Sequence, residues 1–211
     1  MSGIFDEIII KGVRSGNIPA QTQKSREWFR ETAREHNKKT LSTGQRVNVR
    51  INERRLVNSE PGRLRVQAKP GHMYMYLYDP KTKDDLPYYD RFPLIFPFRV
   101  ESDRFWGINL HYLPLPFRAK LMDALYDISN NKRYDETTKL RLSYQVLNSA
   151  AKFKYFKPCV KQYLFNRMQS KFVYIYPSEW DIALFLPLER FEKASKTQVW
   201  AQSKKQISEN R

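Results

Sequence analysis

The residues with the clearest chemical potential in this chain are cations that lie among aromatic rings. The run KFKYFK alternates the two kinds of side chain at residues 152–157. Ammonium and guanidinium groups can neutralise phosphates while neighbouring rings stack on bases. In the alternative interpretation, Phe153 and Phe156 join an apolar core and the lysine stems lie along its surface. The candidate phosphate ligands here are Lys152, Lys154, Lys157, Lys161 and Arg167.

A second basic region lies nearer the start of the chain. Residues 37–69 are rich in Arg, Asn, Ser and Thr, carry few aliphatic residues, and are interrupted at Pro61-Gly62. This composition is typical of an extended arm that becomes ordered on a partner. Its candidate phosphate ligands are Arg46, Arg50, Arg54, Arg55, Arg63 and Arg65.

A loop between two apolar runs carries a third set of candidates. It begins at Asp79-Pro80 and ends at the sequence YYDR, residues 88–91. Aromatic side chains on a loop can form a recognition site that stacks on bases, although these rings could also pack inward where a strand begins. We predict phosphate contacts for Lys81, Lys83 and Arg91, and stacking for Tyr88, Tyr89 and His111.

Catalytic chemistry is much less evident. The three histidines lack metal-ligand spacing, Cys159 is the single cysteine, and no phosphate-binding glycine loop or GxSxG motif occurs. Metal-dependent DNA cleavage needs converging carboxylates. The best local set is Asp79, Asp84, Asp85 and Asp90, which keeps a nuclease open as an alternative, although interleaved lysines favour a solvated loop. We therefore predict a protein that is not an enzyme and holds no metal or cofactor.

The net charge of +16 is unevenly distributed along the 211 residues. Residues 1–71 carry an excess of eight positive charges, residues 72–151 of one, and residues 152–211 of seven. A near-neutral centre with basic flanks predicts a polyanionic partner, nucleic acid first and an acidic protein surface second. A basic surface kept for solubility is the alternative. Apolar runs are short, so we expect no transmembrane segment, no membrane partner and no secretory signal.

The central part of the chain predicts a small curved sheet. Three apolar runs, residues 73–78, 92–100 and 105–113, are separated by turn residues. In the first run methionine and leucine alternate with tyrosine, so the strand is covered on both faces or displays its tyrosines to a partner. Pro93 and Pro97 require the second strand to be an edge, bent or bulged. These features favour an SH3-like antiparallel barrel over residues 71–116.

The remaining elements are mainly helical. Leucines at four-residue spacing predict a helix over 117–129, another begins at Asp135, and a third is expected over 158–169. A strand at 171–176 and a helix at 180–185 follow. The predicted fold class is α+β, comprising a basic arm with one short helix (1–70, helix 23–38), an α+β core (71–192, helical from 117) and a polar basic tail (193–211).

Several long motifs resemble one viral family. They read MYLYDPK, LPYYDRFPLIFPF, GINLHYLP, RAKLMDALYDI, LNSAAKFKYFKPCVKQYL and PSEWDIALFLP. The segment from about 70 to 200 is similar to the DNA end protectors of T-even-like tailed phages. The resemblance implies a minor virion protein, assembled in the host cytoplasm, that joins the filled head. Such a protein would bind the ends of packaged double-stranded DNA without sequence specificity and shield them from exonuclease.

The resemblance implies no residue roles, and it leaves a second interpretation open. Double-stranded DNA ends are the expected ligand, and portal or neck proteins are the expected neighbours. A structural neck, head–tail connector or baseplate subunit that contacts mainly protein would also use basic arms around a small folded core. The metal-dependent nuclease remains the third alternative.

Overall fold

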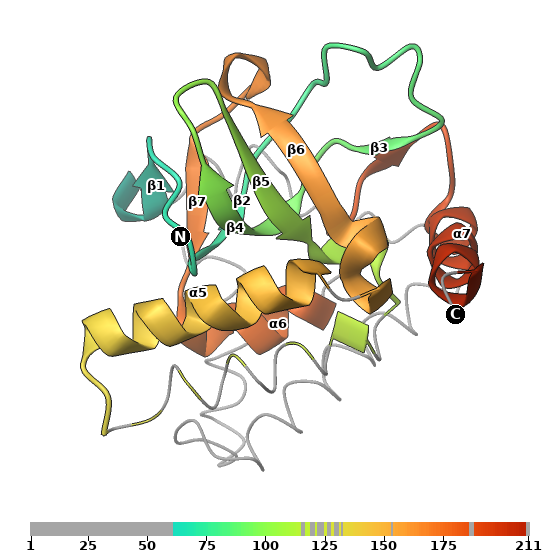
Figure 1. The fold of residues 1–211 in the computed structure, drawn as a ribbon. Coiled ribbons are helices and arrows are strands. Elements are labelled where there is room, and N and C mark those ends of the chain that lie inside the picture. Colours follow the sequence, from blue (N-terminus) through green and yellow to red (C-terminus); the bar gives the residue numbers. More distant parts are fainter. Residues whose placement is uncertain are drawn as a thin grey trace, which may run out of the picture.

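The computed structural model describes residues 61–114, 133–152, 154–185 and 188–209, together with residues 117, 118, 121, 125, 128 and 131. In this part of the chain, one antiparallel sheet has the strand order β1-β7-β2-β4-β5-β6, and β3 pairs with β8 in a separate ribbon (Figure 1). The strands are β1 Leu64–Arg65, β2 Met73–Met75, β3 Tyr89–Asp90, β4 Leu94–Val100, β5 Arg104–Asn109, β6 Val160–Leu164, β7 Phe172–Ile175 and β8 Phe191–Glu192.

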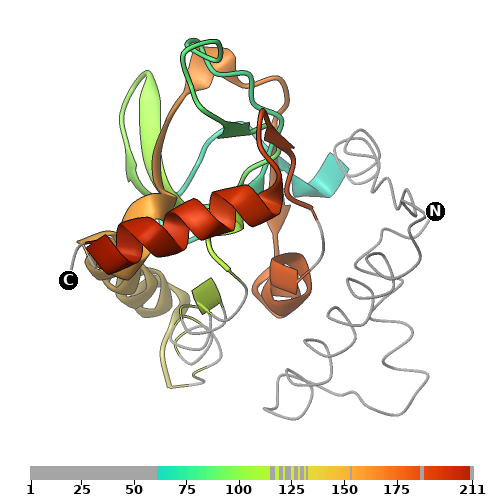
Figure 2. The same cartoon turned by 90° about the vertical axis from the view of Figure 1, so that its right-hand side faces the viewer.

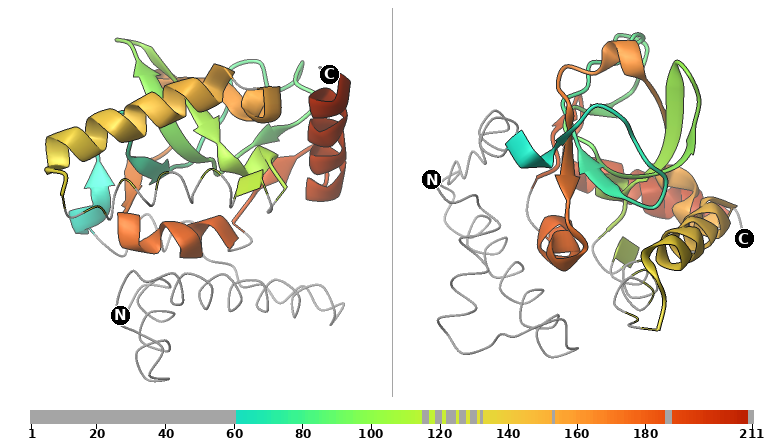
Figure 3. Two further views of the ribbon diagram at one scale, coloured as in Figure 1. Left: turned by 60° about the horizontal axis from the view of Figure 1, so that its bottom comes forward. Right: turned by 90° about the vertical axis from the view of Figure 1, so that its left-hand side faces the viewer.

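Helices cover one face of the six-stranded sheet. The α-helices are α5 Glu136–Lys152, α6 Trp180–Phe185 and α7 Lys196–Glu209. Short 3-10 helices connect the larger elements: η1 Pro61–Arg63, η2 Leu110–Tyr112, η3 Lys154–Cys159, η4 Phe165–Arg167 and η5 Pro177–Glu179. Figure 2 shows α7 crossing the side of the molecule that carries β8, and the right-hand view of Figure 3 shows α5 and α6 below the sheet. Strands and helices together confirm the predicted α+β class.

The alternation of side chains along β2 separates two apolar clusters. Met73 and Met75 belong to the core cluster that also includes residues of α5, α6 and α7, whereas Tyr74 and the following Tyr76 and Tyr78 belong to a second, largely aromatic cluster on the opposite face. All five side chains are buried. The strand is therefore covered on both faces, and its tyrosines are not displayed.

The sheet curls strongly around this aromatic cluster. Phe105 in β5 and Phe172 in β7 are three strand spacings apart, which would be about 14 Å in a flat sheet. Their ring centroids are only 5.6 Å apart. The Tyr78 hydroxyl also accepts a hydrogen bond from the backbone N–H of Leu164 at the β6 edge. The predicted curvature is confirmed.

The closed SH3-like barrel predicted over residues 71–116 is not formed. The sheet takes β1, β6 and β7 from outside that range, and β1 and β6 remain unpaired edges within the described residues. Large rings occupy the concave face between the two halves of the sheet, so side-chain packing substitutes there for a closing ladder of backbone hydrogen bonds.

The proline-containing strand β4 is central rather than at an edge. It pairs with β2 on one side and β5 on the other, and the register shifts between Pro97 and Arg99. This bulge accommodates Pro97, which lacks a backbone N–H donor. The predicted turn between the second and third runs is present, with Glu101 donating its N–H to the carbonyl of Arg104.

Two predicted elements have a different secondary structure. Residues 158–169, expected to be a helix, instead contain β6 and η4. The four-residue spacing of Val160, Leu164 and Met168 is overridden because β5 supplies an antiparallel partner for the whole of β6. Residues 193–211, expected to be a tail, contain α7, whose Val199 and Ile207 belong to the core.

Other predictions agree with the structure where it describes them. The described positions 117, 118, 121, 125 and 128 are helical, and Leu121 and Leu125 are buried in the core. The predicted helix at 180–185 is α6. No helix among the described residues is long and apolar enough to cross a membrane. The division of the chain at residues 70 and 192 stays a prediction, and the helix expected over 23–38 lies outside the described residues.

Gly107 allows β5 to lie closely against β4, and its replacement should destabilise the protein. A Cβ at this position would lie 2.8 Å from the backbone oxygen of Phe96 and would collide with the side chain of Ile95. We expect Gly107→Ala to lower the free energy of unfolding by about 1–3 kcal/mol in chemical denaturation. Gly62→Ala is the matched control, because no atom lies within 4 Å of its added Cβ. Equal stabilities of the two variants would contradict this account.

Candidate nucleic-acid interface

A buried carboxylate, Asp90, fixes the β3–β8 ribbon to the main sheet. Its Oδ2 lies 2.8 Å from Nδ1 of His111 and accepts a hydrogen bond from the Asn109 side chain at 3.0 Å. Its Oδ1 accepts from the backbone N–H groups of Phe92 and Arg190. Burial alone would raise the pKa of Asp90, but the charge of His111 and these hydrogen bonds hold it below its ordinary value.

The loop that precedes β3 is also tied to the rest of the fold. Lys193 has a positive φ of 68°. Its ammonium group donates hydrogen bonds to the carbonyl oxygens of Asp84 and Leu86, at 2.8 and 3.1 Å. The backbone N–H of Asp79 donates to the carbonyl oxygen of Arg167. The loop is therefore held both by the β8 turn and by η4.

A pocket of about 440 Å³ lies between this loop and strand β6. Tyrosine rings and cations make up much of its wall. Four residues singled out from the sequence, Lys81, Tyr88, Tyr89 and Lys161, meet here. The remaining lining residues are Tyr78, Pro80, Thr82, Leu86, Asp90, Arg104, Tyr112, Gln162, Tyr163 and Leu164.

Lys161 is the central cation of this pocket. It projects from β6, is half-buried, and places its Nζ 4.2 Å from the centroid of the Tyr112 ring. Burial lowers the pKa of Lys161, because desolvation penalises the charged ammonium. Burial raises the pKa values of Tyr112 and Tyr88, so both phenols stay neutral at physiological pH. The pocket therefore combines a half-buried cation with neutral aromatic surface.

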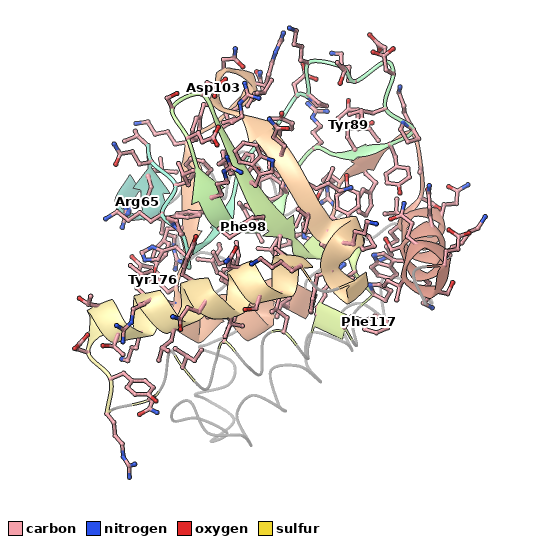
Figure 4. All side chains as sticks on the ribbon, in the orientation of Figure 1. Arg65, Tyr89, Phe98, Asp103, Phe117 and Tyr176 are labelled. Atoms are coloured by element: carbon pink, nitrogen blue, oxygen red, sulfur yellow. The ribbon has the colours of Figure 1, made fainter. Side chains whose placement is uncertain are left out.

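Tyr89 separates this pocket from a second hollow of similar volume. The second hollow is lined by Tyr78, Tyr89, Lys83 and Arg91 together with Leu77, Asp79, Gln169 and Glu192. Figure 4 shows Tyr89 between the loop and the β3–β8 ribbon. Lys83 pairs with Asp79, and Arg91 lies 3.8 Å from Glu192, both as exposed pairs that salt screens readily.

Two other predicted ligands lie on the opposite side of the sheet. Arg63 is buried, makes a two-point ion pair with Glu179, and covers the ring of Tyr176. Arg65 is exposed on β1, far from Tyr89 in Figure 4. It lines a larger hollow of about 750 Å³, whose other described residues include Val66, Val100 and Glu101 and none of the remaining predicted ligands.

The basic segment predicted as one surface is spread over several elements. Lys152 ends α5 and Lys157 lies on η3, both exposed, whereas Lys161 and Arg167 lie on β6 and η4. Lys154 is part of η3, and its side chain is outside the described part. Arg46, Arg50, Arg54 and Arg55 lie outside the described residues. Their roles as phosphate ligands stay predictions.

His111 cannot stack on a base in this structure. Its side chain is fully buried and its ring faces Asp90.

The nuclease alternative depended on four aspartates, Asp79, Asp84, Asp85 and Asp90. Asp90 is buried in the hydrogen-bonded network with His111, whereas Asp84 and Asp85 are exposed to solvent. No three His, Cys, Asp or Glu side chains converge as metal ligands within the described ranges.

Sequence reasoning missed several residues of the pocket. Arg104 and Gln162 were not singled out, because they lie in separate strands. Tyr112 and Tyr163 belong to apolar runs, where tyrosine is expected to be structural. The only sequence signal was the alternation in VKQYL, which places Lys161 and Tyr163 on one strand face.

Replacement of Asp90 should weaken the fold and flatten its acid response. The pKa of Asp90 is lower in the folded than in the unfolded state. The ionised carboxylate therefore stabilises the fold fully at pH values above the pKa of the unfolded state. This stabilisation is lost as the pH falls through the pKa that Asp90 has in the folded state. We expect Asp90→Asn to lower the free energy of unfolding by on the order of 3 kcal/mol at neutral pH. Between about pH 5 and pH 2, the variant should then lose less stability than the parent protein does.

Urea unfolding at several pH values measures this effect. Asp84→Asn, on the exposed loop, is the control and should follow the parent protein. Parallel pH curves for the parent and Asp90→Asn would show that the buried carboxylate does not act in this way.

The chain is similar to one family of known proteins. The sequence model of the family described as phage T4 terminal DNA protecting protein matches residues 29–208. Searches of curated proteins and of solved structures find no match. The family match spans most of the chain and includes every described strand and almost all of α7. The chain belongs to the phage T4 terminal DNA protecting protein family.

Proposed function

We propose that this protein binds the ends of double-stranded DNA without sequence specificity, through the surface around Tyr88, Tyr89 and Lys161. The family match supports DNA end protection as the biological role. The observation that carries the proposal is the meeting of aromatic rings and cations in two adjacent hollows. The proposal includes no chemical reaction.

A surface of this composition suits a DNA end better than the interior of a duplex. The terminal base pair exposes an aromatic face, and every base offers one regardless of sequence. Tyr88 and Tyr89 can contact that face, while Lys81, Lys83 and Arg91 are exposed beside them. These cations can then reach the last phosphates of the two strands. Lys157, Arg167 and the arginines at residues 46–55 would add further phosphate contacts.

The placement of the protein in a phage particle is part of the same proposal. Binding the termini of packaged DNA would place the protein in the virion, at the neck of the filled head, next to portal or neck proteins. In the alternative proposal the protein is a neck or connector subunit that contacts mainly protein. End-dependent DNA binding separates the two proposals.

We expect the protein to bind a linear duplex on the order of tenfold more tightly than the same duplex closed by hairpin loops at both ends. Stacking on an exposed base contributes about 1–3 kcal/mol, and hairpin loops remove the exposed face. Fluorescence anisotropy of labelled duplexes measures both affinities. Equal affinity for the two substrates, or no DNA binding, would contradict the proposal.

The double variant Lys81→Gln/Lys83→Gln tests the proposed phosphate contacts. We expect the slope of log affinity against log salt concentration to become shallower by about two, because each lost phosphate contact changes it by about 0.9. Arg141→Gln is the control, since Arg141 is exposed on α5, away from the loop (Figure 1). An unchanged slope in the double variant would place the contacts elsewhere.

A further inference from the structure

The pocket between the loop and β6 holds a cation, Lys161, that no carboxylate of the described residues pairs with. Several other buried or half-buried charges among the described residues have partners of opposite charge or several hydrogen bonds. Arg63 pairs with Glu179, Lys196 with Glu189 at 3.2 Å, and His111 with Asp90. The buried Arg118 donates to three backbone carbonyls, those of His111, Leu113 and Leu184.

Lys161 differs from these residues. Its only described partner is the face of the Tyr112 ring, which attracts a cation weakly compared with an anion. Asp90, the one carboxylate residue in the pocket lining, already accepts four hydrogen bonds from other groups. Desolvation lowers the pKa of Lys161, and an anion in the pocket would offset that desolvation. Among the described residues, Lys161 therefore has no anionic partner, and an anionic ligand would supply one.

The pocket walls restrict what this ligand can be. A volume of about 440 Å³ lies within the range of about 300–1,000 Å³ typical of small-molecule sites. The loop lies on one side and β6 on the other, so a base-paired duplex cannot lie between them. The rings of Tyr88, Tyr89 and Tyr112 offer aromatic surface next to the ammonium group. A single nucleotide supplies both complementary parts, one phosphate and one base.

We propose that this pocket receives one unpaired nucleotide at the DNA terminus, with its phosphate on Lys161 and its base against the tyrosine rings. The inference rests on the proposed function and makes it more specific. The protein then recognises a frayed or overhanging strand end in addition to the flat face of the last base pair. Lys81 and Arg104, which also line the pocket, face the same phosphate from the loop and from β5.

Two sets of ligands test the proposal in the full-length protein. The first set is thymidine 5′-monophosphate, thymidine and inorganic phosphate, with binding measured by calorimetry. We expect the monophosphate to bind at least tenfold more tightly than either of the others, because only it engages both parts of the pocket. The second set is a duplex with a one-nucleotide overhang and the same duplex with blunt ends. The overhang should bind several-fold more tightly.

Variants of Lys161 link both results to this pocket. Lys161→Met keeps the apolar stem over Tyr112 and removes the charge, so it should lose at least tenfold in monophosphate affinity and abolish the overhang preference. Lys161→Arg keeps the charge and should retain both. Lys205→Met, on the exposed face of α7, is the matched control. Thermal unfolding of each variant verifies that the fold is intact.

The outcomes separate this inference from the proposed function. A protein that distinguishes open from closed duplex ends, but binds no monophosphate and treats blunt and overhanging ends alike, overturns the pocket proposal and leaves end binding standing. Monophosphate binding that is unchanged in Lys161→Met also overturns it. A parent protein that binds open and hairpin-closed duplexes with equal affinity overturns both proposals together.

Discussion

The hydrogen-bonded carboxylate of Asp90 is the constraint on which the described surface depends. Alternation along β3 directs Asp90 inward, whereas Tyr89 is half-buried and Arg91 is exposed. Asp90 therefore anchors these two neighbours directly. It also joins three parts of the chain that are distant in sequence, because its partners come from β5, from η2 and from the segment before β8. A buried charge is costly to desolvate, and here His111 and three further hydrogen-bond donors offset that cost. The ribbon β3–β8 consequently has a defined position beside the sheet although it pairs with none of the sheet's strands.

The aromatic core and the aromatic wall of the pocket are continuous. Tyr78 and Tyr163 belong to the cluster on the concave face of the sheet, and both also line the pocket. Tyr112 belongs to the other cluster and contacts Tyr88 and Phe191 of the loop and ribbon. Because these rings pack in the interior, they have little freedom to rearrange when a ligand arrives. A ligand that meets such a wall loses less binding free energy to the ordering of side chains than it would on a mobile surface.

The parts of the fold that followed from sequence are those encoded by local patterns. The alternation in MYMYLY, the turn at Glu101–Arg104 and the amphipathic pattern after Asp135 each depend on neighbouring residues, and each appears in the structure. Strand β6 was mistaken for a helix because its partner β5 lies about fifty residues earlier. Helix α7 was missed because its buried stripe consists of Val199, Ser203 and Ile207, and the polar Ser203 is accommodated only by donating to the carbonyl of Tyr112. For the site, residue type identified Lys81, Tyr88, Tyr89 and Lys161. It could not show that Arg63 and His111 are internal, since their partners Glu179 and Asp90 are fixed by the tertiary fold alone.

Charge and shape suggest different contributions from the flanks and from the core. On the loop, Lys81 and Lys83 alternate with Asp79, Asp84 and Asp85, so this surface has no strong net attraction for the phosphates of an unbroken duplex. The excess positive charge lies before residue 72 and after residue 151. Long-range attraction to a polyanion therefore comes mainly from the flanks and acts on any DNA segment. Discrimination of an end requires a feature that the duplex interior lacks, and the exposed face of a terminal base is such a feature. The hollows around Tyr89 supply aromatic surface with limited net charge, so in our proposal the core selects among sites to which the flanks have already brought the protein.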